Sequence, residues 1–270
     1  MYKEYRQPRK IEYFESPQEI LAAIFDAISE HQRVWKCSGT IHGNINPDTL
    51  FIGSSSPNTR ERGFIKPPTP YDQANPMFQS VNALSRTVLH RSNALPLDYL
   101  DDLESFYYVI AWLALAYIGP GRRLSRQDFP DVLKHWASDP YSRKAVLKKQ
   151  EILLGDGFGC NNLNVCVFLC GRTTERFLRK LHGILRARYR EKLYFGRAMT
   201  WEEMSKASEV AYGEFLWEIQ SMIGILDDME RSKRSHAMIV SHGGLFPDDL
   251  KILKKRYETM GYKFDEEPDW

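Results

Sequence analysis

The first clear element along the chain is an amphipathic helix that begins at Ser16. The Ser16 hydroxyl can accept a hydrogen bond from the first turn, Pro17 suits the first helical position, and Glu19 completes a capping box. Apolar side chains then recur at the three- and four-residue spacing of one helix face. The pattern predicts a helix to about residue 36, with a buried stripe of Ile20, Ile24, Ala27, Ile28, Val34 and Trp35.

The middle of the chain combines an irregular stretch with a strongly apolar helix. Residues 53–80 are rich in Ser, Pro, Asn and Gly, which predicts loops with one short strand at 64–65. A short helix is expected at 80–90. The segment that opens at Asp101 has acidic residues in its first turn and is then apolar on nearly all faces through Tyr117. We therefore expect a helix there, buried at the centre of the fold.

The pattern stays helical beyond this point. Helical periodicity indicates further helices near 126–137, 141–154, 172–193, 201–227 and 248–260. Few segments alternate in the manner of strands. The sequence therefore predicts a mainly α fold.

Composition narrows the class of protein. The chain has 270 residues, of which 43% are hydrophobic, and its net charge is +2. Because this net charge is close to zero, the composition does not favour nucleic acid as a partner. The longest apolar run, 106–118, is too short to span a bilayer. The N-terminus lacks the apolar core of a signal peptide, and the four cysteines form no CxxC pair. These features predict an intracellular protein, cytoplasmic or nuclear; a signal peptide removed from the N-terminus would instead indicate secretion.

The candidate chemistry lies between the first helix and the first strand. Residues 42–49 read HGNINPDT and lead into the apolar 50–52. They keep the frame of the protein-kinase catalytic loop, H-R-D-x-x-x-x-N. Two further segments follow in order, FQSVNAL at 78–84 and LDDLESFYYV at 100–109. Together the three resemble the C-terminal lobe of the fungal-type protein kinase family, in which a D-D-L-E-S-F segment is a hallmark.

The resemblance covers roughly residues 12–120 and implies a kinase C-lobe-like helical domain with little β structure. We expect an extended lead-in at 1–15, this helical domain at 16–261 and a C-terminal tail at 262–270. About fifteen residues precede the first helix. The expectation is therefore that the N-terminal lobe, with its phosphate-binding loop, is absent.

The residues that carry phosphoryl transfer in this family are replaced. Asn44 stands at the position of the Asp that accepts the substrate proton, and its amide does not take up a proton near neutral pH. Thr49 replaces the metal-binding Asn of the loop. The segment that would contain the other metal-binding residue, an Asp, is Lys66-Pro67-Pro68 here. The resemblance thus implies a chain that is not an enzyme, with no catalytic residue, no cofactor and no metal.

Other matched positions are expected to serve structure. By resemblance, Asp102 accepts hydrogen bonds from the loop backbone at His42, and His42 packs against the core. Asn82 replaces the acid that forms a buried ion pair near the end of the family's activation segment.

Four other features have a functional and a plainer reading. The glycine-rich 155–159 is read as a flexible loop rather than a phosphate site, because no Gly-Lys-Ser/Thr ending follows. The basic helix 172–192 is read as a solvated face rather than a surface for acidic partners. Buried or isolated side chains are favoured over a metal site or a catalytic group for the remaining candidates, which are Cys160, Cys166, Cys170, His182, His236 and His242.

The main functional hypothesis is a catalytically inactive kinase-like protein, a pseudokinase, that acts as a protein-binding scaffold or regulatory subunit. A protein partner or a homodimer would cover the face left by the missing lobe, unless residues 1–15 and 262–270 fold over it. Two alternatives remain. One is a secreted fungal effector that mimics a kinase surface. The other is one half of a split kinase, with a partner chain supplying the N-lobe and the missing acids.

Overall fold

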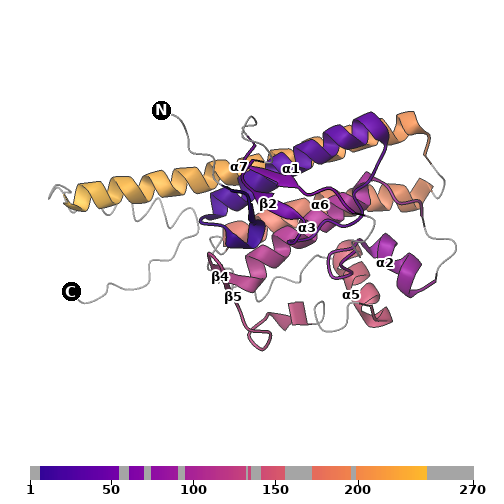
Figure 1. Ribbon diagram of the computed structural model, residues 1–270, viewed down its shortest axis with the longest axis horizontal. Helices are drawn as coiled ribbons and strands as arrows, with labels where there is room; N and C mark the ends of the chain where they lie inside the picture. Colours follow the sequence, from indigo (N-terminus) through magenta and orange to yellow (C-terminus); the bar gives the residue numbers. More distant parts are fainter. Residues whose placement is uncertain are drawn as a thin grey trace. The chain divides into compact units, whose positions relative to one another are not determined.

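The computed structural model describes residues 7–54, 61–69, 74–90, 95–131, 133–134, 141–155, 172–195 and 199–241. Residue contacts divide the chain into two compact units, 1–223 and 224–270. The first unit contains every element below except the C-terminal part of α7 (Figure 1). The elements are β1 (Arg9–Lys10), a 3-10 helix η1 (Ile11–Tyr13), α1 (Pro17–Ser38), β2 (Leu50–Ile52), β3 (Gly63–Ile65), α2 (Val81–Val88), α3 (Tyr99–Ala116), β4 (Tyr117–Gly119), β5 (Arg122–Arg123), α5 (Arg143–Leu154), α6 (Arg172–Phe195) and α7 (Trp201–Ser241). The predicted mainly α fold is confirmed.

Helix α1 begins as its sequence predicts, with one change in the cap. The Ser16 hydroxyl accepts a hydrogen bond from the Glu19 N–H at 3.1 Å. The Glu19 carboxylate does not return to Ser16; it accepts from the Glu15 N–H and pairs with Arg9. The predicted stripe is buried except for Val34, which is 39% exposed, because His31 and Trp35 form the buried face of the helix there.

The described residues before α1 form the short strand β1 and the 3-10 helix η1. Strand β1 pairs antiparallel with β2, and β2 pairs antiparallel with β3, so the three form a small sheet in the order β1-β2-β3. Helix α1 packs on this sheet. The contact is closest at Gly63, where an added β-carbon would lie 2.5 Å from both the Cα and the Cβ of Ala23.

Substituting Gly63→Ala is therefore expected to destabilise the fold by about 1–3 kcal/mol, because helix α1 or strand β3 must move to admit the methyl group. Urea denaturation followed by circular dichroism measures the loss. Gly183→Ala is the matched control: this exposed glycine of α6 has open space around its β-position, so alanine there is expected to stabilise by about 0.4–1 kcal/mol. Equal effects of the two substitutions would contradict the close approach of α1 and β3.

Helix α3 is the centre of the first unit. All of its residues are buried, and it contacts α1, α2 and α6, as Figure 1 lets the reader follow. It starts at Tyr99, two residues before the predicted position, because Asp98 caps it. The Asp98 carboxylate accepts from the Leu100 N–H, and Asp101 reaches back to the Asp98 N–H. After Phe106, helix α3 is apolar on nearly all sides. It therefore has no polar face to turn toward solvent, which explains why it lies at the centre of the unit.

Three of the later helices agree with the predicted pattern where the structure describes them. Helices α5 and α6 lie at the predicted positions, and α7 continues beyond residue 227 to Ser241. His182, on α6, is buried, and its Nε2 lies 2.8 Å from the Ile152 carbonyl oxygen, which ties α6 to the end of α5. The described helices include none with the length and apolarity to cross a membrane.

Several predictions fall on residues outside the described ranges. They concern the glycines at 156–159, the end of the domain at 261, the helix at 248–260, and the side chains of Cys160, Cys166, Cys170, His236 and His242. The helix predicted near 126–137 starts later than expected: residues 126–129 form turns and a bend, and the Leu133 and Lys134 N–H groups bond back to the Pro130 carbonyl oxygen, so the helical residues follow Pro130. Residues 132 and 135–137 of that prediction lie outside the described ranges.

Candidate functional site

The loop at 42–49 is anchored to the central helix by Asp102. This carboxylate, 1% exposed, accepts hydrogen bonds from the backbone N–H of His42 at 2.6 Å and of Gly43 at 2.9 Å. The resemblance predicts this contact. Gly43 has a positive φ of 72°, a conformation that glycine adopts at low cost. The loop backbone is thus held against α3 by one buried charge.

A third partner of Asp102 comes from α1. The His31 Nε2 lies 2.8 Å from an Asp102 carboxylate oxygen, and its Nδ1 lies 2.6 Å from the Tyr212 hydroxyl on α7. Burial acts to raise the pKa of Asp102, but the hydrogen bonds from His31 and from the loop N–H groups outweigh it and hold that pKa below its usual value. Burial and the nearby Asp102 charge raise the pKa of Tyr212 well above 10. The Tyr212 phenol is therefore protonated and able to donate to His31.

Sequence reasoning missed this buried chain of polar groups. His31 falls on the same stripe of α1 as Ile24, Ala27, Ile28 and Trp35, and all of these residues are buried. Its place on an apolar stripe was the available signal, because a buried histidine needs a hydrogen-bonding partner. Nothing in the local sequence indicated that the partners are Asp102 and Tyr212.

Inside the loop, the Asn44 side chain serves as a structural tie. It is 8% exposed, and its Oδ1 accepts hydrogen bonds from the Asn46 Nδ2 at 2.7 Å and from the backbone N–H of Asn75 at 3.1 Å. The second bond joins the loop to the segment that leads into α2. The side-chain oxygen at the position of the family's proton acceptor is therefore occupied by two donors of the chain itself.

The Thr49 hydroxyl is also used within the loop. It accepts from the Asn46 N–H at 3.0 Å and lies 3.1 Å from the Asn44 carbonyl oxygen and 3.0 Å from the Asn46 carbonyl oxygen. Thr49 is buried. A hydroxyl with these internal partners closes the loop on itself and leaves little capacity for an outside ligand.

The His42 side chain is half-buried and bonds within and beyond the loop. The Nε2 lies 2.9 Å from the Lys66 carbonyl oxygen, and Nδ1 accepts from the Asn44 N–H at 3.2 Å. His42 thereby links the loop to the chain just after β3, where Lys66 and the residues at 67–69 supply no carboxylate.

A second buried polar cluster is centred on Glu104, two residues after Asp102 on α3. The Glu104 carboxylate is fully buried and accepts from the Val81 N–H at 2.9 Å and from the hydroxyls of Tyr108 and Tyr189, both at 2.6 Å. Burial raises the pKa of Glu104 to about 7, although these donors act against the rise. The cluster joins α2, α3 and α6 around one carboxyl group.

Lys149 of α5 stands close to this cluster and holds the segment before α2. Its Nζ donates to the Gln79 carbonyl oxygen at 2.7 Å and lies 4.1 Å from the centre of the Tyr108 ring. Asn82, which replaces the family's acid, donates from Nδ2 to the Leu95 carbonyl oxygen at 3.0 Å. The segment before α2 is thus fixed by a lysine that binds backbone carbonyls. Burial lowers the pKa of Lys149 to about 7.

The basic side chains of α6 form ion pairs at several positions. Lys192 lies 2.9 Å from an Asp98 carboxylate oxygen and 3.4 Å from Asp101, at the start of α3. Arg188 pairs with Glu191 and, at 2.9 Å, with Glu214 of α7. These bonds use the charges to join α6 to α3 and α7. They favour the reading of this helix as a structural, solvated face.

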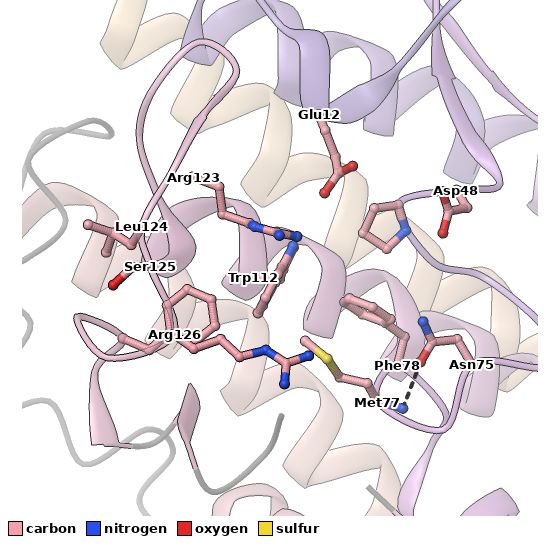
Figure 2. Close-up of a pocket in the computed structure, with 12 residues that line it drawn as sticks. Glu12, Asp48, Asn75, Met77, Phe78, Trp112, Arg123, Leu124, Ser125 and Arg126 are labelled. Carbon is pink, nitrogen blue, oxygen red and sulfur yellow. Dashed lines mark hydrogen bonds between the residues drawn. The ribbon is translucent and has the colours of Figure 1, made fainter. Parts of the chain in front are cut away.

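A pocket of about 420 Å³ opens beside the loop (Figure 2). Its walls come from five separate parts of the first unit: η1, the loop, the segment before α2, helix α3, and β5 with the residues that follow it. The lining residues are Glu12, Pro47, Asp48, Asn75, Met77, Phe78, Trp112, Arg123, Leu124, Ser125, Arg126 and Phe129. No group of three or more His, Cys, Asp or Glu side chains suited to a metal ion occurs in the described part of the chain.

Comparison with known proteins bears on the first part of the chain. No curated protein and no solved structure matches the sequence. A family match begins just before β1 and ends within α3, so it includes the loop, Asp102 and the small sheet. Residues 7–114 match the family described as fungal protein kinase, and this part of the chain is similar to that family.

Proposed function

We propose that this chain is a catalytically inactive, kinase-like protein that acts as a protein-binding scaffold or regulatory subunit. The observation that carries the proposal is the bonding of Asn44. An amide replaces the carboxylate that would accept the substrate proton, and its Oδ1 already accepts from Asn46 and Asn75. A general base must be free to reach the proton it removes and must be able to hold it. Asn44 has neither property.

The residues present do not fit the magnesium ions that the family implies. Magnesium prefers carboxylate and phosphate oxygens in octahedral geometry. The loop offers the Thr49 hydroxyl, which is buried and bonded to Asn46 and Asn44, and the chain after β3 offers Lys66 in place of an acid. A lysine side chain supplies no oxygen ligand for a metal ion. No step of phosphoryl transfer is therefore assigned to this chain.

The loop nevertheless keeps a defined shape, which supports a role in binding. Asp102, Asn44 and Thr49 fix its backbone through buried hydrogen bonds. On the side of the sheet away from α1, the rings of Phe51 and Phe64 stack with centroids 5.3 Å apart, and both side chains stay partly exposed. Partly exposed aromatic side chains on a rigid support are typical of surfaces that bind other proteins.

We expect no change in thermal stability when ATP with magnesium or manganese is added at millimolar concentration, because the metal position lacks acids. A ligand present at a hundred times its Kd would stabilise the folded chain by about 2.7 kcal/mol, an easily measured rise in Tm. Differential scanning fluorimetry gives the readout, and an active kinase domain with the same nucleotide is the control. A metal-dependent rise in Tm, or phosphate transfer from ATP to a generic protein substrate, would contradict the proposal.

A further inference from the structure

The pocket beside the loop carries positive charge that the described residues leave unpaired. Both acids that line it are already engaged. The Glu12 carboxylate accepts a hydrogen bond from the Tyr117 hydroxyl, and Asp48 forms an ion pair with the Lys10 Nζ at 2.6 Å. The two basic residues of the lining, Arg123 and Arg126, are exposed, and their guanidinium groups form no hydrogen bond or ion pair with any described residue.

These two arginines approach the pocket from one side. Arg123 ends β5 and Arg126 follows three residues later, and Figure 2 shows both guanidinium groups reaching over the cavity from the same stretch of chain. A guanidinium group presents several N–H donors in a planar fork that matches a carboxylate. An anionic group held between them would gain charge-assisted hydrogen bonds that this chain does not itself supply.

The floor of the pocket is aromatic and rigid. The Trp112 ring meets Phe78 edge-to-face with centroids 6.1 Å apart, and meets Phe129 edge-to-face at 5.3 Å. All three rings are at least nine-tenths buried by their neighbours, and Met77 adds a flexible apolar side chain at the edge. An aromatic side chain placed on this floor would pack against ring edges and the methionine sulfur. The volume lies within the range of about 300–1,000 Å³ found for ligand sites.

We infer that this pocket binds an acidic peptide segment of a partner protein, with an aromatic side chain on the Phe78–Trp112–Phe129 floor and a neighbouring carboxylate between Arg123 and Arg126. The inference rests on the proposed protein-binding function and specifies its partner by chemistry. Charge complementarity selects an acidic segment over a basic one, because Lys10 neutralises Asp48 and the two arginines then outweigh the single carboxylate of Glu12.

The test is fluorescence anisotropy with labelled peptides and the full chain. One peptide contains Trp next to Asp and Glu, a second has Lys in place of the acids, and a third keeps the acids but has Ala for Trp. We expect only the first to bind at micromolar concentration, and its affinity to fall as salt is raised. The Arg123→Ala/Arg126→Ala variant is expected to weaken this binding by about tenfold or more.

The matched control is Arg122→Ala/Lys144→Ala, which removes the same charge from exposed residues outside the pocket lining. Equal affinity of the two variants would overturn the inference, as would equal binding of the acidic peptide without Trp or tighter binding of the lysine peptide. A dimer in sedimentation velocity that the pocket variant dissociates would assign the pocket to a second copy of the chain and also overturn it. None of these outcomes depends on the nucleotide experiment. If the peptide assay fails, the proposed lack of phosphoryl transfer can still be tested with ATP.

Discussion

Substituting Asp102→Ala is expected to lower the free energy of unfolding by about 3–5 kcal/mol, because three hydrogen-bond donors lose a shared buried acceptor and each unmet buried donor costs about 1–3 kcal/mol. The change leaves the N–H groups of His42 and Gly43 without an acceptor and deprives His31 of its carboxylate. Each of these groups is then buried or half-buried with an unmet hydrogen bond. Urea denaturation followed by tryptophan fluorescence and far-UV circular dichroism measures the loss.

The control for this experiment is Asp131→Ala. This carboxylate is exposed and lies 3.5 Å from Lys134, so its loss is expected to change stability by less than about 0.5 kcal/mol. Asp102→Asn tests the charge separately, because an amide oxygen can keep one loop contact but carries no charge, and the amide NH2 group cannot accept a hydrogen bond. A loss below about 1 kcal/mol for Asp102→Ala would mean that the loop is held by its internal bonds alone.

The second large effect is a dependence of stability on pH that arises from Glu104 and Lys149. Burial raises the pKa of Glu104 from 4.5 to about 7, so between these values the folded chain keeps a proton that the unfolded chain has lost. Stability from this group is therefore complete below pH 4.5 and falls as pH rises toward 7, by up to about 1.4 kcal/mol per pH unit. Burial lowers the pKa of Lys149 from 10.5 to about 7. Its contribution accordingly rises from pH 7 toward 10.5, and the pair predicts a minimum near pH 7.

Two substitutions separate the fall in stability below pH 7 from the rise in stability above it. Glu104→Gln is expected to remove the fall between pH 4.5 and 7, and Lys149→Met is expected to remove the rise above pH 7. The other groups that face Glu104 are the phenols of Tyr108 and Tyr189, whose pKa values burial raises well above 10, so they stay protonated across this range. The urea midpoint at each pH unit from 5 to 9 is the measurement. A parallel pH profile for Glu104→Gln and the unmodified chain would contradict the assignment to Glu104.

Local sequence signals predicted the elements of the fold more fully than its contacts. The cap at Ser16 and the uniformly apolar stretch after Phe106 depend on residues within one or two turns, and both predictions are confirmed. The predicted hydrogen bond from the Ser16 N–H to the Glu19 carboxylate was wrong. Glu19 instead bonds to Arg9 and Glu15, which come from the preceding strand and turn. Short-range sequence patterns cannot predict which of several donors a carboxylate will bind, because the positions of the donors depend on tertiary packing.

The candidate site follows the same division. The loop positions Asn44 and Thr49 could be named from the resemblance alone, and the Asp102 contact with the loop followed from it. The partners His31 and Tyr212 could not, because they lie 71 and 110 positions from Asp102 and meet only when α1, α3 and α7 pack together. The pocket was also beyond sequence reasoning. Its lining comes from five segments, none of which carries a binding motif of its own.

The complete burial of α3 also bears on how this sequence can change over generations. A helix enclosed on every side tolerates few side chains at any position, because a larger residue overpacks and a smaller one leaves a cavity. Helices α6 and α7 present exposed faces, on which many polar residues serve equally well. Mutations are therefore expected to accumulate faster after α3 than within it.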